Sequence, residues 1–212
     1  MAGRRKKAQA PPPEPTVNVR LSGSGGQGLI LAGRLLAEAA ALHDGLDVVQ
    51  TNSYGPEARG GASRSDVVLG RGEIDDLHPS VTDVLVCLNQ ASCDAFYQDL
   101  TPNGLLITDS DNVKVVPTTR ALEAPMTALS RQVAGTPMAA NVAALAVLAA
   151  VTKIVTRDAL KAALKDRLPP AHLEGNLKVL DAGFAEASEI LARMSEKKRA
   201  LLPDFSDLRL SR

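Results

Sequence analysis

A glycine-rich stretch between a strand and a helix constrains the fold of this chain more than any other feature. Residues 17–21 alternate as a β-strand does, and residues 29–42 have a helical pattern. Between them, the sequence Gly23-Ser24-Gly25-Gly26-Gln27-Gly28 fits GxGxxG. Such glycines permit a tight turn, a close approach of backbone to a pyrophosphate, and close packing of the helix on the strand. The helix start then attracts an anion; the alternative is that the glycines serve packing alone.

The rest of the chain alternates between strand and helix patterns. Strands are expected at residues 47–51, 66–69, 83–88 and 105–108, with a helix at 91–100 and a turn at Asn103-Gly104. Helices are expected at 137–152, 156–168 and 173–200, with Thr156 and Asp158 placed to cap the second of these. The predicted class is α/β: a Rossmann-like, mostly parallel sheet with flanking helices and a helical C-terminal half.

The length of 212 residues suits one domain with a tail at each end. Residues 1–15 combine four basic residues with a proline run and are predicted to be a disordered leader. Such a leader fits an expression remnant, a tether or an arm over a partner. Residues 16–200 form the predicted domain. Residues 201–212 are a tail with several apolar side chains, which suits either a partner-docking segment or a frayed terminus.

Composition excludes several classes of function. The chain has 24 basic and 24 acidic residues, so its formal net charge is zero, and aromatic residues make up 2%. These values argue against a nucleic-acid binder, which needs a basic surplus or stacking rings. The apolar stretch 138–155 carries Asn141 and Lys153 and fits a buried helix better than a membrane span. With no signal peptide, and with Cys87 and Cys93 expected as buried free thiols, the predicted location is the cytoplasm.

The second predicted strand narrows the choice of ligand for the glycine stretch. A dinucleotide-binding domain has an acidic residue about 20 positions on, at the end of that strand. Residues 48–52 read Val-Val-Gln-Thr-Asn there, so NAD is disfavoured. The Walker sequence is absent as well. A different pyrophosphate ligand, such as coenzyme A, remains open.

Residues 52–65 are predicted to be a loop rich in glycine, serine and arginine. The loop comes after the second strand and is expected to meet the glycine stretch in the crevice where open α/β sheets bind ligands. Arg59 and Arg64 have side chains that pair with phosphates or carboxylates in bidentate geometry. The alternative is an ordinary surface loop whose arginines lie in water.

Four stretches together resemble a known family. They are GSGGQGLILAG, SYGPEARGGASRSDVVL, DVLVCLNQ and PNGLLITDSD. Asn141 and Asn176 agree with positions where that family carries asparagine. Over residues 17–190 the sequence resembles the gamma subunit of 2-oxoacid:ferredoxin oxidoreductases, nearest the 2-oxoglutarate branch.

The resemblance implies a role inside a larger enzyme. That enzyme cleaves a 2-oxoacid on thiamine diphosphate, passes electrons through iron–sulfur clusters to ferredoxin or another acceptor, and forms an acyl-CoA with release of CO₂. The implied partners are the thiamine-binding alpha and beta subunits and a cluster-carrying subunit, which would hold thiamine diphosphate, Mg²⁺ and the clusters. The gamma domain supports coenzyme A use and assembly. The implied binding residues in this chain are Gly23, Ser24, Gly25, Gly26, Gln27, Gly28, Tyr54, Arg59 and Arg64.

Catalysis by this chain alone is not expected. Its only histidines, His43, His78 and His172, fall at predicted helix ends or beside a proline, and no catalytic serine or thiamine-binding motif is present. Three hypotheses remain: an accessory gamma subunit, a non-enzymatic interaction module of Rossmann-like fold, or a free-standing dinucleotide-dependent oxidoreductase. The first is preferred on the resemblance.

Overall fold

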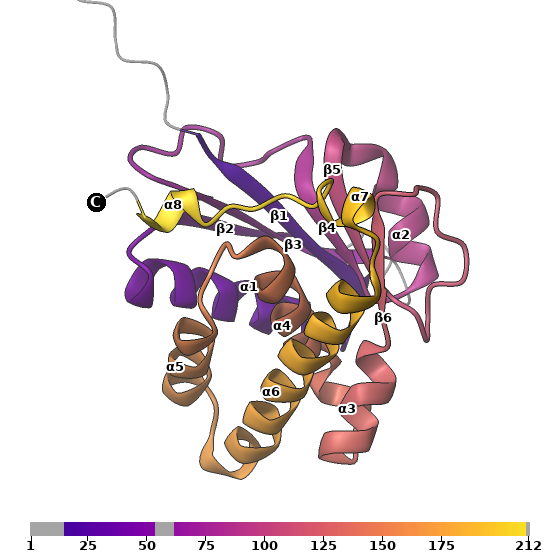
Figure 1. Cartoon of the computed structure of the whole chain (residues 1–212). Coiled ribbons are helices and arrows are strands. Elements are labelled where there is room, and N and C mark those ends of the chain that lie inside the picture. The colour runs from indigo at the N-terminus through magenta and orange to yellow at the C-terminus, as the bar shows by residue number, and fades with distance from the viewer. Residues whose placement is uncertain (1–14, 54–61, 211–212) are drawn as a thin grey trace, which may run out of the picture.

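Six strands form one mixed sheet at the centre of the structure, a computed structural model that describes residues 15–53 and 62–210 (Figure 1). The strands are β1 (Val17–Ser24), β2 (Asp47–Ser53), β3 (Ala62–Gly70), β4 (Thr82–Cys87), β5 (Leu100–Asp109) and β6 (Ala121–Ala124). Their order across the sheet is β2-β3-β1-β4-β5-β6. The pairs β1–β4, β4–β5 and β5–β6 are parallel, which confirms a mostly parallel α/β sheet.

Strand β3 is the exception in this sheet. It pairs antiparallel with β1 on one side and with β2 on the other, so it lies between the two strands that α1 connects. In register, Ser24 lies opposite Ala62 and Ser53 lies opposite Arg64. The amino end of β3 is therefore at the same edge of the sheet as the carboxyl ends of β1 and β2.

Helices cover both faces of the sheet. They are α1 (Leu29–Glu38), the π-helix η1 (Ala39–His43), α2 (Gln90–Phe96), the 3₁₀-helix η2 (Tyr97–Asp99), α3 (Met126–Ala134), the 3₁₀-helix η3 (Pro137–Ala139), α4 (Ala140–Thr152), α5 (Arg157–Arg167), α6 (Pro170–Arg193), α7 (Glu196–Arg199) and α8 (Asp207–Leu210). Helices α1, α4, α5 and α6 lie together on one side, and α2 lies on the other (Figure 1).

The core follows from the apolar patterns of β4 and α4. In β4, Val84 and Val86 join the large cluster on the α1 side, whereas Leu85 and Cys87 join a smaller cluster on the α2 side. A strand apolar at every position is thus buried on both faces. Helix α4 is apolar around its whole circumference, and all but one of its residues are buried. No helix within residues 15–53 and 62–210 is long and apolar enough to cross a membrane.

Several predicted boundaries are wrong. Asn103 and Gly104 lie inside β5, which begins at Leu100, because the pairing with β4 resumes beyond them: Val84 pairs with Leu105 and Thr82 with Leu100, with a shift of register between the two pairs. The predicted loop at 52–65 is shorter, since β2 continues to Ser53 and β3 begins at Ala62. The predicted helix at 173–200 begins at Pro170 and ends at Arg193, and Ser195 caps the separate helix α7. Thr156 caps α5, as predicted.

The C-terminal strap, defined as residues 201–209, packs on the domain. Leu202, Phe205 and Leu208 are partly buried against the large cluster. The Phe205 N–H donates to the Thr152 carbonyl at 2.8 Å, and Arg209 Nε donates to the Lys153 carbonyl at 2.9 Å. In Figure 1 the strap and α8 cross the sheet at the edge where β1 begins. The leader at residues 1–14 lies outside the described residues.

Candidate functional site

The glycine stretch lies at the carboxyl edge of the sheet. From β1 the chain passes through α1 to β2 on one side, while β4 lies on the other side of β1. The direction of the crossovers therefore reverses between β1 and β4, and ligands of open α/β sheets bind at such a point. Residues 23–28, which we call the glycine cradle, follow β1 there, and Leu88 and Asn89 follow β4.

Hydrogen bonds of the Gln27 and Asn89 side chains fix the conformation of the glycine cradle. The Ser24 N–H donates to Gln27 Oε1 at 2.7 Å, and Gln27 Nε2 donates to the Leu88 carbonyl at 3.4 Å. Asn89 Nδ2 donates to the Ser24 hydroxyl, while Asn89 Oδ1 accepts from the Ser92 N–H and caps α2. The side chain of Gln27 is thus used to shape the loop, and Asn89 ties the loop to β4 and α2.

The backbone in the middle of the glycine cradle is exposed. Gly25 and Gly26 are exposed, and a Cβ built on either would meet no atom of the described residues within 4 Å. The first turn of α1 has no side-chain cap and no acidic residue. Its free N–H groups and the positive end of the helix dipole favour a negatively charged group at this place. A phosphate fits an exposed backbone of this kind.

Gly28 turns the chain into α1 in a left-handed conformation, with φ 71°. Its carbonyl accepts a hydrogen bond from Asn141 Nδ2 at 3.0 Å, and a Cβ on Gly28 would lie 2.4 Å from that nitrogen. Asn141 lies in the first turn of α4 and is 3% exposed. The start of α1 is therefore fixed by a buried amide from a different helix.

Helix α1 packs closely on the β2–β3 hairpin at Gly33. A Cβ there would lie 2.0 Å from Ser65 Oγ and 2.7 Å from Gln50 Nε2. Gln50 Nε2 also donates to Ser65 Oγ at 3.0 Å and to the Ile30 carbonyl at 3.3 Å. The absence of a side chain at Gly33 therefore lets α1 approach the two strands, and Gln50 supports α1.

The strand beside the glycine cradle is β3, whereas the prediction against NAD was based on the end of β2. That prediction placed the end of β2 next to β1, but β3 lies between them. The residues beside the cradle on that side are Ala62, Ser63 and Arg64, which include no carboxylate. The residues of β3 beside the cradle therefore do not supply the acidic residue that would hold the ribose of a dinucleotide, since the carboxylate of this strand, Asp66, lies opposite Arg20.

Arg64 lies on β3 in a cluster of charged residues on the α2 face. Its Nε is 3.2 Å from Asp66 Oδ2, and its guanidinium carbon is 5.4 Å from the centre of the Phe96 ring. Arg20, which is 1% exposed, binds Asp66 and Asp99 and lies 5.4 Å from the same ring. Two carboxylates thus balance two guanidinium groups. The role of Arg64 as a phosphate ligand stays a prediction, and Tyr54 and Arg59 lie outside the described residues.

The two cysteines are free and buried, as predicted. The hydrogen bond with Cys93, together with burial, raises the pKa of Cys87 well above its usual range. The same hydrogen bond lowers the pKa of Cys93. The Cys87 sulfur also accepts a hydrogen bond from Ser22 Oγ at 3.4 Å. This pair packs β4 against α2.

The paired acids at Asp109 and Asp111 serve the fold. Asp109 is fully buried and accepts from Asn112 Nδ2 and from Thr127. Asp111 accepts from the Ala128 N–H in the first turn of α3. Within residues 15–53 and 62–210, His, Cys, Asp and Glu side chains form no group of three that could hold a metal ion.

Two supporting residues were not singled out as site residues from the sequence. Asn89 had one signal, an asparagine directly after a buried strand, which is typical of a helix cap. Asn141 was noted only through the resemblance, because no local pattern connects it with Gly28, 113 positions earlier. Contacts of that kind depend on the packing of α4 beside α1.

Comparisons with known proteins identify the family to which the chain belongs. The family model for pyruvate ferredoxin/flavodoxin oxidoreductase matches residues 18–186. The 2-oxoglutarate synthase subunit KorC of Methanocaldococcus jannaschii is 39% identical over 179 residues, which are 81% of this chain and 94% of the relative. KorC of Methanothermobacter thermautotrophicus is 42% identical over 173 residues, or 78% of this chain and 92% of the relative.

Solved structures give the same result. The gamma subunit of a keto/oxoacid ferredoxin oxidoreductase from Geobacter sulfurreducens has a TM-score of 0.75 and 38% identity, and covers 83% of this chain and 98% of that one. The 2-oxoglutarate:ferredoxin oxidoreductase of Magnetococcus marinus has a TM-score of 0.73 at 22% identity, and covers 82% of this chain and 31% of that one, a likeness of fold. The chain therefore belongs to the pyruvate ferredoxin/flavodoxin oxidoreductase family, as a gamma subunit of a 2-oxoacid:ferredoxin oxidoreductase.

Proposed function

We propose that the glycine cradle binds the phosphate groups of coenzyme A when the complex converts a 2-oxoacid to its acyl-CoA. The observation that carries this proposal is the exposed backbone at Gly25 and Gly26, beside an uncapped helix start at the carboxyl edge of the sheet. Coenzyme A presents a pyrophosphate and a further phosphate. Backbone N–H groups and a helix dipole recognise such groups without a lysine or arginine.

The proposed 2-oxoacid is 2-oxoglutarate. Two supporting relatives are named as subunits of 2-oxoglutarate synthase, and the chain spans more than nine-tenths of each. The Magnetococcus marinus enzyme of the same fold is described with 2-oxoglutarate, coenzyme A and succinyl-CoA bound. The substrate pocket itself is proposed to lie on partner subunits, together with thiamine diphosphate, Mg²⁺ and the iron–sulfur clusters. The proposed role of this chain is then to bind coenzyme A, which accepts the acyl group, and to support assembly of the complex.

Replacing Gly25 by valine in the assembled complex tests the cradle. The valine side chain would project into the space that the phosphate needs, yet it would meet no atom of the described residues at its Cβ. We expect the KM for coenzyme A to rise about tenfold or more, as for the loss of a hydrogen bond to a charged group. Steady-state kinetics with varied coenzyme A gives this value, and thermal unfolding checks that the subunit remains folded.

Pantetheine supplies the matched control, because it carries the reacting thiol without the nucleotide phosphates. If the glycine cradle binds phosphate, the valine variant should use pantetheine as the wild-type complex does. An equal loss with both acceptors would mean that the loop acts on something other than the phosphates. Unchanged kinetics with coenzyme A in a folded complex would remove the proposed site.

A further inference from the structure

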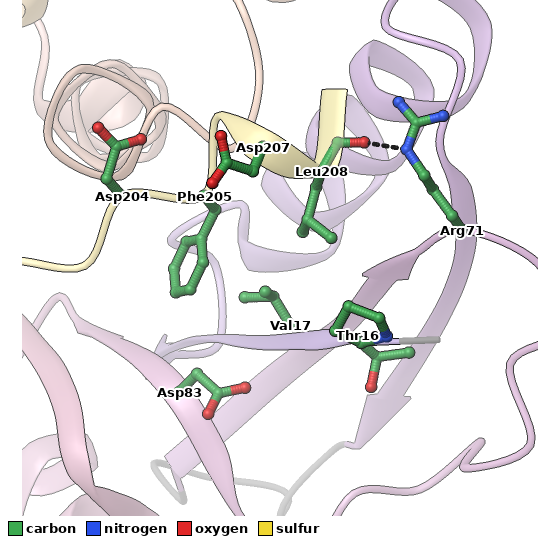
Figure 2. Close-up of a pocket in the computed structure, with 9 residues that line it drawn as sticks. Thr16, Val17, Arg71, Asp83, Asp204, Phe205, Asp207 and Leu208 are labelled. Atoms are coloured by element: carbon green, nitrogen blue, oxygen red, sulfur yellow. Dashed lines mark hydrogen bonds between the residues drawn. The ribbon is translucent and has the colours of Figure 1, made fainter. Parts of the chain in front are cut away.

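A cavity lies at the edge of the sheet opposite the glycine cradle. Its volume is about 430 Å³, and it is enclosed between the start of β1 and the C-terminal strap. Figure 2 shows Phe205 and Leu208 of the strap on one side of it, with Val17 of β1 and Asp83 of β4 on the other. The strap thus does more than cover the sheet edge, because it leaves a lined space beneath it.

The apolar residues that line this cavity lie outside the part of the chain that the family model matches. The family model matches residues 18–186, whereas Pro15, Val17, Phe205 and Leu208 all lie beyond those limits. Segments from the two ends of the chain, far apart in sequence, therefore meet at one place. The place where they meet is also where the described N-terminal part begins, since Pro15 itself lines the cavity.

The surroundings of the cavity are acidic. The connection from β3 to β4 starts at Arg71 and leads to Asp83, both of which line the cavity, and it carries the exposed Glu73, Asp75 and Asp76. Asp204 and Asp207 of the strap segment are also exposed and line the cavity.

The basic residues at this edge hold the strap in place. Arg71 Nε donates to the Leu208 carbonyl, Lys153 Nζ is 2.5 Å from Asp204, and Arg209 Nε donates to the Lys153 carbonyl. The cavity lining has three acidic residues (Asp83, Asp204, Asp207), and the connection that ends at Asp83 adds three more (Glu73, Asp75, Asp76), whereas the basic residues that bind the strap are three (Arg71, Lys153, Arg209). The edge suits a positively charged, partly apolar occupant.

We propose that this acidic edge binds the chain's own N-terminal segment, with Arg4–Lys7 paired to the acids of the β3–β4 connection and Pro11–Pro13 against Phe205. The segment has four consecutive basic residues followed by a proline run. Prolines bind well on aromatic side chains. Seven residues separate Lys7 from Pro15, and they span about 25 Å at full extension, which is enough to reach across the edge. The proposal is independent of the coenzyme A site.

Zero-length cross-linking of the full chain tests the proposal. A carbodiimide joins an amine to a carboxylate only where the two are in contact, and Lys6 and Lys7 supply the amines. We expect links from Lys6 or Lys7 to Glu73, Asp75 or Asp76. In a mixture of light and heavy isotope-labelled chains, the linked peptides should be light–light or heavy–heavy. The links should weaken at 1 M salt, where the Debye length falls to about 3 Å.

A triple variant and a matched control sharpen the result. Glu73→Gln/Asp75→Asn/Asp76→Asn removes three exposed charges from the edge, and we expect the remaining links from Lys6 and Lys7 to the cavity acids to fall about tenfold, as for three exposed ion pairs. Asp158→Asn/Asp166→Asn/Glu189→Gln removes three exposed charges from α5 and α6, which do not line the cavity, and should leave the links unchanged.

Three outcomes would overturn the proposal. Mixed light–heavy links would assign the edge to a second copy of the chain. Cross-links from Lys6 or Lys7 mainly to carboxylates elsewhere would show that the N-terminal segment binds a different surface. Absence of leader links in wild-type chain at low salt, while links of known neighbours such as Lys153 with Asp204 do form, would show that the segment does not bind there.

Discussion

At the residue scale, the glycine cradle depends on amide side chains that the sequence pattern does not point to. The GxGxxG spacing predicts the turn, the exposed backbone and the helix start, because those follow from the chain's local geometry. The supporting hydrogen bonds do not follow from it. Asn141 reaches Gly28 from α4, and Asn89 reaches Ser24 from the end of β4. Such contacts require the layers to be assembled first.

Replacing Asn141 by leucine should destabilise the domain by about 1 kcal/mol, because the Gly28 carbonyl would lose its side-chain donor and keep only the Ala32 N–H. Chemical denaturation of the isolated variant measures this change. Asn176→Leu is the matched control: its amide bonds only to the His172 carbonyl within α6, so the change there should be small. Equal effects of the two substitutions would mean that the Asn141 hydrogen bond contributes nothing particular.

At the element scale, the position of α1 over the β2–β3 hairpin is set by a close approach. Gly33 admits Ser65 and Gln50 at distances that no side chain would allow. Strand and helix types were largely predictable, because buried runs such as β4 and α4 have strong apolar patterns. The place of β3 in the sheet was not predictable, since its pairing is decided by neighbours rather than by its own sequence. The short strand β6 and helix α3 lacked a pattern long enough to detect.

Replacing Gly33 by alanine should cost about 1–3 kcal/mol, as overpacking of a tight contact does. The comparison is Gly175→Ala in α6, where the new Cβ would lie 3.8 Å from Ala134 Cβ, an ordinary contact. Because alanine favours a helix interior, that control should stabilise by roughly 0.5–1 kcal/mol. Thermal unfolding of both variants gives the difference, and a neutral Gly33→Ala would show that the hairpin yields easily.

At the scale of the whole molecule, the strap joins the C-terminal end of the chain to the edge where the sheet begins. The tail was predicted to be either a partner-docking segment or a frayed end. Its apolar residues pack on the domain's own core, and docking to a partner stays a prediction. An apolar pattern in a tail predicts burial but does not specify the surface. Here that surface is supplied by the end of α4 and the start of β1.

Asp204 makes the attachment of the strap sensitive to acid. Its hydrogen bond with Lys153, helped by those from Ser206, lowers its pKa from 3.8 to about 2. Because the pKa of Asp204 is lower in the folded state, its contribution to holding the strap is complete above pH 3.8. That contribution is lost as the pH falls through about 2. We therefore expect hydrogen exchange of the Phe205 amide to lose protection in that window.

The Asp204→Asn variant is the control for this measurement. Its Phe205 amide should be less protected at neutral pH than in the wild type and should show less change between pH 4 and 2. The Lys153 amide, bonded to the Ala149 carbonyl inside α4, reports whether the domain as a whole has opened. A wild-type profile that matches the variant's would show that the carboxylate does not hold the strap.

Because β3 pairs directly with β2, the order of the strands does not depend on the stretch that connects these two strands. Since β2 and β3 are adjacent and antiparallel up to Ser53 and Arg64, residues 54–61 join neighbouring strands without a crossover. A stretch connected in this way can be exchanged or lengthened while every strand keeps its partners. A chimeric subunit that carries the equivalent stretch of a relative should therefore keep the strand order and the pairing of this sheet.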